Sequence, residues 1–232
     1  MVDCITHCIF DVDGLILNTE IIYYAVLEEI ANDFGKHFSQ QIQSEMMGSP
    51  TETAMTLFVQ RIGVDEIYYP SIMQKFKNLL SERLPDCNLI KGVERLVYHL
   101  HANNIPLGIA TGSDRYSFEM KTKNHKKFFN YFAVQMLSDN IKLNRPKPYP
   151  DIYELAMQKF GSPDINPRNV LVFEDSLAGV QAAAAAKMHV IMVPSLPLNI
   201  IESKLPSGID IISSLESFKP EQYGLPPFPK VT

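Results

Sequence analysis

The 232-residue sequence lacks the features that several broad classes of protein require. It has three cysteines, an odd number without the spacing of a metal site, and no apolar run reaches the roughly 18 residues that a membrane span needs. The N-terminus has no basic segment followed by a long apolar run, which argues against a secretory signal. These absences predict a cytoplasmic protein with free thiols and no membrane partner.

The charge balance gives no support to nucleic-acid binding. The formal net charge is -5, and no basic cluster offsets it. The densest basic stretch, residues 121–127, is interrupted by Asn124 and His125 and is interpreted as a solvated helix face. We therefore expect no nucleic acid polymer as a partner, and we expect a monomer of ordinary globular composition.

The pattern of apolar residues divides the chain into two kinds of structure. After a first apolar strand that ends at Phe10, residues 16–87 show helical spacing and no convincing strand, which predicts an all-helical insert. From residue 92 onward, short apolar strands alternate with helices, which is typical of a parallel α/β sheet. The predicted helices are residues 18–34, 51–62, 72–83, 92–102, 113–129, 151–160 and 177–187, and the later strands are residues 106–110, 133–137, 170–173 and 189–193. The Pro-rich segment from about Leu215 is expected to follow the surface irregularly.

The fold class that follows is α/β. We predict a Rossmann-like doubly wound parallel sheet as the core domain, formed by residues 1–15 and 88–232, with an inserted helical domain at residues 16–87.

Polar residues follow the predicted strands at the points where those strands end. Ligands of open parallel sheets bind outside the carboxyl ends of the strands, so these segments are expected to converge. They contribute Asp11, Asp13, Thr111, Gly112, Ser113, Glu174 and Asp175, and Lys147 stands ahead of the helix predicted at residues 151–160 and is expected to join them.

These residue types suit phosphate chemistry. Several carboxylates in one site repel each other and need a cation, and oxygen ligands without Cys or His favour Mg²⁺. A hydroxyl of Thr111 or Ser113, backbone N–H groups and the Lys147 ammonium would hold a phosphoryl group. Of the two carboxylates one residue apart, Asp11 is the candidate nucleophile and Asp13 the candidate acid/base.

Each piece alone has an ordinary structural explanation. Asp-x-Asp can form a turn, Thr111-Gly112-Ser113 can begin a helix, Lys147 between prolines can lie on a surface loop, and Glu174-Asp175 can be a polar loop. Their order, each after a predicted strand, favours function over coincidence.

The same motifs, in the same order, resemble those of the haloacid dehalogenase-type phosphohydrolases, and the helical insert resembles their cap domain. Within that superfamily the chain most resembles the eukaryotic pseudouridine-5'-phosphatases. The stretches that carry this resemblance are "FDVDGLILNTE", "MKTKNHKKFF", "KPYPDIYELA", "LVFEDSLAGVQAA" and "FKPEQYGLP".

The resemblance implies a role for each motif residue. Asp11 would be nucleophile and metal ligand, and Asp13 would be the general acid/base with its backbone carbonyl on Mg²⁺. Asp175 would be a direct metal ligand and Glu174 would act through water. Thr111 and Lys147 would hold the phosphate. Dehalogenases of the superfamily lack the second aspartate, which this chain has as Asp13. Sugar-phosphate mutases similar to β-phosphoglucomutase carry His-x-x-x-Trp where this chain has Tyr23 and Leu27, so the resemblance favours hydrolysis.

The resemblance implies a cap that governs substrate choice and a small phosphorylated metabolite, pseudouridine 5'-phosphate, as substrate. Two departures bear on this. Ser49-Pro50-Thr51 stands where basic residues are expected, and Asn18 stands where many relatives have aspartate. A phosphatase of another small metabolite, such as a sugar or polyol phosphate, and a catalytically silent binding protein on the same fold remain alternatives.

Overall fold

The computed structural model describes residues 4–46, 51–162, 164–195 and 197–229. The chain divides into two compact units, one formed by Met1–Leu17 with Leu89–Thr232 and the other by Asn18–Asn88. The second unit differs from the predicted insert, residues 16–87, by one or two residues at each end. Its role in substrate choice stays a prediction.

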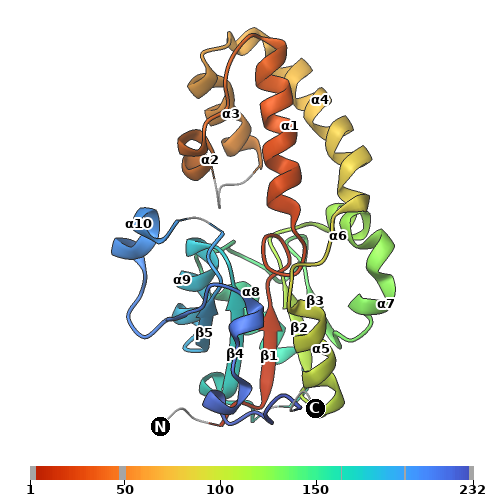
Figure 1. Cartoon of the computed structure of the whole chain (residues 1–232), viewed down its shortest axis with the longest axis vertical. Coiled ribbons are helices and arrows are strands. Elements are labelled where there is room, and N and C mark those ends of the chain that lie inside the picture. The colour runs from red at the N-terminus through yellow and green to blue at the C-terminus, as the bar shows by residue number, and fades with distance from the viewer. Residues whose placement is uncertain (1–3, 47–50, 163, 196, 230–232) are drawn as a thin grey trace. The chain divides into compact units, whose positions relative to one another are not determined.

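The larger unit is built on a parallel sheet (Figure 1). The order β3-β2-β1-β4-β5-β6 places β1 at the centre, between β2 and β4, as in doubly wound folds. This confirms the predicted α/β class. The strands of the described residues are β1 (His7–Phe10), β2 (Leu107–Ala110), β3 (Val134–Met136), β4 (Val170–Glu174), β5 (His189–Met192) and β6 (Asp210–Ile211).

Apolar side chains are buried on both faces of the sheet, because successive residues of a strand point to opposite sides. On one face, Ile9 of β1 and Val172 of β4 share an apolar cluster with Tyr153 of α8. On the other, Phe10 stacks on Phe173 with ring centroids 4.6 Å apart. The helices of this unit are α5 (Val93–Ala102), α6 (Arg115–Thr122), α7 (Lys126–Phe129), α8 (Asp151–Gln158), α9 (Leu177–Ala185) and α10 (Leu198–Ile201).

Two features of this unit differ from the sequence prediction. The single helix expected over residues 113–129 is divided into α6, the 3₁₀ turn Lys123–His125 and α7. At the end of α6 the Thr122 hydroxyl donates to the carbonyl of Phe118, a back-bond that tends to bend helices. The short strand β6 was not predicted, because two exposed residues give no periodic signal.

Lys187 adopts a left-handed backbone conformation, with φ of 62°. A non-glycine residue in this conformation costs about 1 kcal/mol, which affects stability alone.

All the regular elements among the described residues of the smaller unit are helices or 3₁₀ turns, which confirms the predicted all-helical insert. Its core includes Phe38, whose ring meets those of Tyr24 and Phe58. Ser49 and Pro50, which stand where basic residues are expected in relatives, lie outside the described residues. The helices of this unit are α1 (Thr19–Asp33), α2 (Gln40–Met46), α3 (Thr51–Ile62) and α4 (Tyr69–Arg83), with 3₁₀ turns at Glu66–Tyr68 and Leu84–Asp86.

Two further observations concern the cysteines and the helices. Cys4, Cys8 and Cys87 are free thiols. Among the described residues, no helix combines the length and the apolar character needed to cross a membrane.

Candidate active site

The carboxyl ends of the three central strands bring the predicted motifs to one edge of the sheet. Asp11 follows β1, Thr111 follows β2, and Asp175 follows β4. Both β2 and β4 pair with β1 in register, so their last residues lie beside the end of β1. The convergence expected from the sequence is therefore present in the fold.

Three buried carboxyl groups form a cluster at this edge. One oxygen atom from each of Asp11, Glu174 and Asp175 lies within 4.8 Å of the others. Oxygen-only donors at this spacing fit a hard divalent cation such as Mg²⁺. Like charges this close also repel, so the cluster needs positive charge nearby.

Lys147 supplies one such charge. Its Nζ atom donates to Oδ1 of Asp11 at 2.7 Å, to Oε1 of Glu174 at 2.5 Å, and to the carbonyl of Ala110 at 3.1 Å. Burial alone would lower the pKa of Lys147, but Asp11 and Glu174 outweigh it and hold that pKa well above its usual value. The ammonium therefore stays charged and links two carboxylates.

Asp11 needs more positive charge than Lys147 provides. Burial, with smaller contributions from Glu174 and Asp13, raises the pKa of the Asp11 carboxyl to about 7, against the opposing effect of Lys147. A bound cation would favour the ionised carboxylate and offset this shift.

Glu174 is held by hydrogen bonds on both of its oxygen atoms. Tyr153 donates its hydroxyl to Oε1 at 2.6 Å, and Oε2 accepts from the N–H groups of Asp175 and Ser176 at 3.0 and 3.1 Å. The Ser176 hydroxyl adds a bond of 3.1 Å to Oε2. Burial would raise the pKa of Glu174, but Lys147 and these donors hold it below its usual value. Glu174 thus anchors the cluster as an ionised carboxylate.

Sequence reasoning assigned no role to Tyr153. The residue lies on the buried face of α8, where an aromatic side chain normally indicates packing. Its hydroxyl is buried as well, and burial and Glu174 raise the pKa of Tyr153 well above its usual value, so it remains a donor. Only the hydrogen bond between Tyr153 and Glu174, which lie 21 residues apart in the chain, reveals this role.

Asp13 stands apart from the acidic cluster and has partners of its own. Its Oδ2 accepts from the hydroxyls of Ser113 at 2.9 Å and Thr111 at 3.4 Å. Its Oδ1 accepts from Nζ of Lys121 at 2.5 Å. The structure therefore brings the predicted site residues to one edge of the sheet. It gives Asp11 and Asp13 different partners, Lys147 for the first and Lys121 with Ser113 for the second.

Lys121 corrects the prediction for residues 121–127. This side chain is fully buried, with an exposed fraction of 0%, whereas the stretch was interpreted as a solvated helix face. Lys123, Lys126 and Lys127 are exposed as expected. One lysine of the four points inward because Asp13 and Ser113 lie there to receive its ammonium.

Gly112 borders open space at the start of the segment that follows β2. A Cβ atom built at this position would meet no heavy atom within 4 Å. The neighbouring N–H of Ser113 donates to the Thr111 hydroxyl at 3.1 Å, and Asp114 caps helix α6 by accepting from the N–H of Ser117. The backbone beside Gly112 is thus open to a ligand at the sheet edge.

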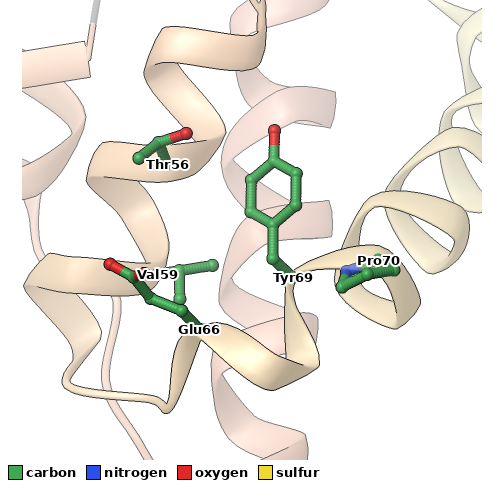
Figure 2. A pocket seen from close by; sticks show the side chains of 5 residues that line it. All are labelled: Thr56, Val59, Glu66, Tyr69 and Pro70. Atoms are coloured by element: carbon green, nitrogen blue, oxygen red, sulfur yellow. The ribbon is translucent and has the colours of Figure 1, made fainter.

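The smaller unit contains a separate pocket of about 320 Å³ (Figure 2). It is formed by α3 together with the segment that leads into α4. The lining residues carry a carboxylate but no cationic side chain, so this pocket is poorly suited to a phosphate group. They are Thr56, Val59, Glu66, Tyr69 and Pro70.

The comparisons with known proteins agree on one family. The family model described as haloacid dehalogenase-like hydrolase matches residues 8–193. "(DL)-glycerol-3-phosphatase 2" of Arabidopsis thaliana is 38% identical over 225 residues, covering 97% of this chain and 93% of the relative. "Probable pseudouridine-5'-phosphatase" of Drosophila melanogaster is 37% identical over 225 residues, covering 97% of this chain and 96% of the relative.

A solved structure supports the fold over nearly the full length. A haloacid dehalogenase family hydrolase from Deinococcus radiodurans, with bound phosphate and sodium, matches with a TM-score of 0.77 at 21% identity. The match covers 96% of this chain and 98% of the other. At this identity the likeness establishes the fold alone.

Proposed function

Because the chain belongs to the haloacid dehalogenase-like hydrolase family, we propose that it hydrolyses phosphate monoesters through an aspartyl-phosphate intermediate. The observation that carries this proposal is the meeting of Asp11, Lys147 and the Glu174–Asp175 pair at the end of β1. Phosphatases among the relatives support the reaction class.

Asp11 is the nucleophile in this proposal. Lys147 binds its Oδ1 atom, so the attack on phosphorus is assigned to Oδ2. A bond forms between Oδ2 and phosphorus while the bond from phosphorus to the ester oxygen breaks. The carboxylate is nearly buried, which removes competing water from the attacking atom.

Asp13 is the general acid/base. It protonates the departing ester oxygen in the first step. In the second step it takes a proton from water, whose oxygen attacks phosphorus and breaks the bond to Asp11. Inorganic phosphate leaves, and both carboxyl groups return to their starting states.

Backbone and side chains of the segments that follow β2 and β3 would hold the phosphate. The open space at Gly112 admits a phosphoryl oxygen next to the backbone, and Lys147 contributes positive charge. Thr111 and Ser113 remain proposed phosphate ligands, although their hydroxyls bond Asp13 here.

The cation proposed for this site is Mg²⁺. Asp11, Asp175 and the backbone carbonyl of Asp13 would hold it, with Glu174 acting through water, because Lys147, Tyr153 and backbone N–H groups already bind both Glu174 oxygens. When bound, Mg²⁺ would keep Asp11 ionised and neutralise charge on the phosphoryl group. Asp13 lies outside the cluster of carboxylate oxygens, which is consistent with its acting through the backbone.

The substrate is proposed to be a small phosphorylated metabolite, selected by the helical unit formed by residues 18–88. The sequence motifs favour pseudouridine 5'-phosphate. A polyol phosphate is the second candidate, because a glycerol-3-phosphatase is as similar to this chain as the pseudouridine-5'-phosphatase is. The substitution of Ser49-Pro50-Thr51 for expected basic residues bears on the choice between them.

The test is phosphate release from pseudouridine 5'-phosphate, uridine 5'-phosphate and glycerol 3-phosphate, each with and without Mg²⁺. We expect activity that requires Mg²⁺ and is lost in Asp11→Asn, while the exposed Asp164→Asn keeps wild-type rates. The ratio of kcat/KM between the first and third substrates identifies the substrate class. Retained activity in Asp11→Asn would overturn the mechanism, and silence on all three esters would favour the binding-protein alternative.

A further inference from the structure

Lys121 is a charged side chain in a place where the fold alone would favour an apolar one. It lies in the last turn of α6 and is completely buried. Burying an ammonium group is strongly unfavourable unless it is paired and hydrogen-bonded. Its Nζ atom donates to Oδ1 of Asp13 at 2.5 Å and to Oγ of Ser113 at 2.7 Å.

These contacts hold both oxygen atoms of the Asp13 carboxylate. Lys121 binds Oδ1, and the Ser113 hydroxyl, which itself accepts from Lys121, donates to Oδ2 at 2.9 Å. The terminal torsion of an aspartate is otherwise broad, so a triangle of contacts is needed to hold one orientation. The three groups come from the ends of β1 and β2 and from α6, so only the folded core assembles them.

We propose that Lys121 is a positioning residue, which orients the Asp13 carboxyl group for proton transfer to the departing ester oxygen and, in the second step, from water. The inference rests on the proposed function, because it assigns Lys121 a role only through Asp13. Lys121 differs in this from Lys147, whose Nζ atom contacts the proposed nucleophile Asp11 and Glu174.

The dependence of the reaction on the leaving group tests this role. A p-nitrophenolate leaves without protonation, whereas the alkoxide of glycerol 3-phosphate needs a proton, so misplacing Asp13 affects the two esters unequally. Because kcat/KM includes steps only up to formation of the aspartyl-phosphate, we compare kcat/KM of Lys121→Met on both esters with Mg²⁺. General acids contribute about 10²- to 10⁴-fold, so we expect a loss of at least about tenfold on glycerol 3-phosphate and much less on p-nitrophenyl phosphate.

Three further variants make the test specific. Lys123→Met changes an exposed lysine two residues away and should keep wild-type kcat/KM on both esters. Ser113→Ala removes another contact to the same carboxylate. Because Ser113 is also a proposed phosphate ligand, this variant should lower kcat/KM on both esters, with a larger loss on glycerol 3-phosphate. That difference keeps the test valid if Lys121→Met folds poorly. In an Asp13→Asn background, Lys121→Met should cause no further asymmetry, because the group it positions is gone.

Two results would overturn the inference while leaving the proposed function intact. One is an equal loss on both esters, which indicates a general structural or phosphate-binding role for Lys121. The other is an unchanged kcat/KM on both esters in Lys121→Met. A wild-type protein without activity on these two esters and on pseudouridine 5'-phosphate would instead overturn the proposed function, and the inference with it.

Discussion

A Cβ atom built on Gly179 would lie 1.7 Å from Oε1 of Glu174. Gly179 belongs to the first turn of α9, and Glu174 is the last residue of β4. The carboxylate therefore occupies the volume that any other side chain at position 179 would fill. Glycine is normally unfavourable inside a helix, so its presence here is explained by the space that the buried carboxylate needs.

Gly179→Ala should destabilise the protein, although helix propensity alone would favour alanine by about 1 kcal/mol. The added methyl group displaces Glu174 from its donors and disturbs the acidic cluster. We expect a lower Tm, because overpacking a buried site is destabilising. We also expect Mg²⁺-dependent phosphate release to fall at least about tenfold, because disturbing the groups around a metal site typically costs that much activity. Thermal unfolding and phosphate release measure the two effects.

Gly112→Ala provides the control for stability, because its Cβ would meet no atom within 4 Å. Its Tm should stay close to that of the wild type. A Tm of Gly179→Ala at or above the wild-type value would show that the helix can move away from Glu174 without loss.

The raised pKa of Asp11 predicts a dependence of stability on pH in metal-free protein. The pKa rises from 3.8 when exposed to about 7 in the fold, chiefly because of burial, so the folded state binds more protons between these values. The contribution of Asp11 to stability therefore becomes less favourable as pH rises through this window and is fully unfavourable above pH 7.

Asp11→Asn removes this unfavourable term. In the presence of a chelator, the stability of Asp11→Asn relative to wild type should increase from pH 4.5 to pH 8 by about 3 kcal/mol, or ~6–12 °C in Tm. Adding Mg²⁺ at pH 8 should raise the Tm of wild type more than that of Asp11→Asn. A Tm difference that does not change with pH would contradict the assigned ionisation.

Tyr153→Phe should lower stability by about 1–3 kcal/mol, because the buried Oε1 atom of Glu174 loses a donor at 2.6 Å. The ring itself remains and continues to fill the core beneath the sheet. Denaturant unfolding measures the effect. Tyr116→Phe, on an exposed tyrosine, should change stability by no more than about 0.5 kcal/mol. Equal effects of the two variants would show that the Tyr153 hydroxyl is unimportant.

Removing Asp13 should destabilise the protein through the lysine it neutralises. Asp13→Ala takes away the carboxylate 2.5 Å from the buried Lys121 ammonium, a change that typically costs about 3–5 kcal/mol. Lys121→Met in the same chain should recover much of that loss, since it removes the buried charge. Additive effects of the two substitutions in thermal unfolding would contradict the coupling.

Much of the fold and part of the site follow from local sequence patterns. The alternation of strands and helices, the helical insert and the placement of Asp11, Thr111 and Asp175 after strands were predicted and are present in the structure. Periodicity reports which face of an element is apolar, and the carboxyl ends of parallel strands must meet at one edge. The division of residues 113–129 into two helices was not predicted, because local back-bonding at Thr122 leaves the apolar spacing unchanged.

The sequence by itself determined that carboxylates, hydroxyls and a lysine gather at the end of the central strands, because each follows its own strand. Only the tertiary structure decided which of these groups contact one another. Tyr153 and Lys147 belong with Glu174, whereas Lys121 and Ser113 belong with Asp13. A basic run such as residues 121–127 has the same composition whether its first lysine points to solvent or inward. The inward direction of the Lys121 side chain is set by the Asp13 carboxylate, which lies 108 residues away in the chain. Their electrostatic attraction depends on distance in space, which no local sequence pattern reports.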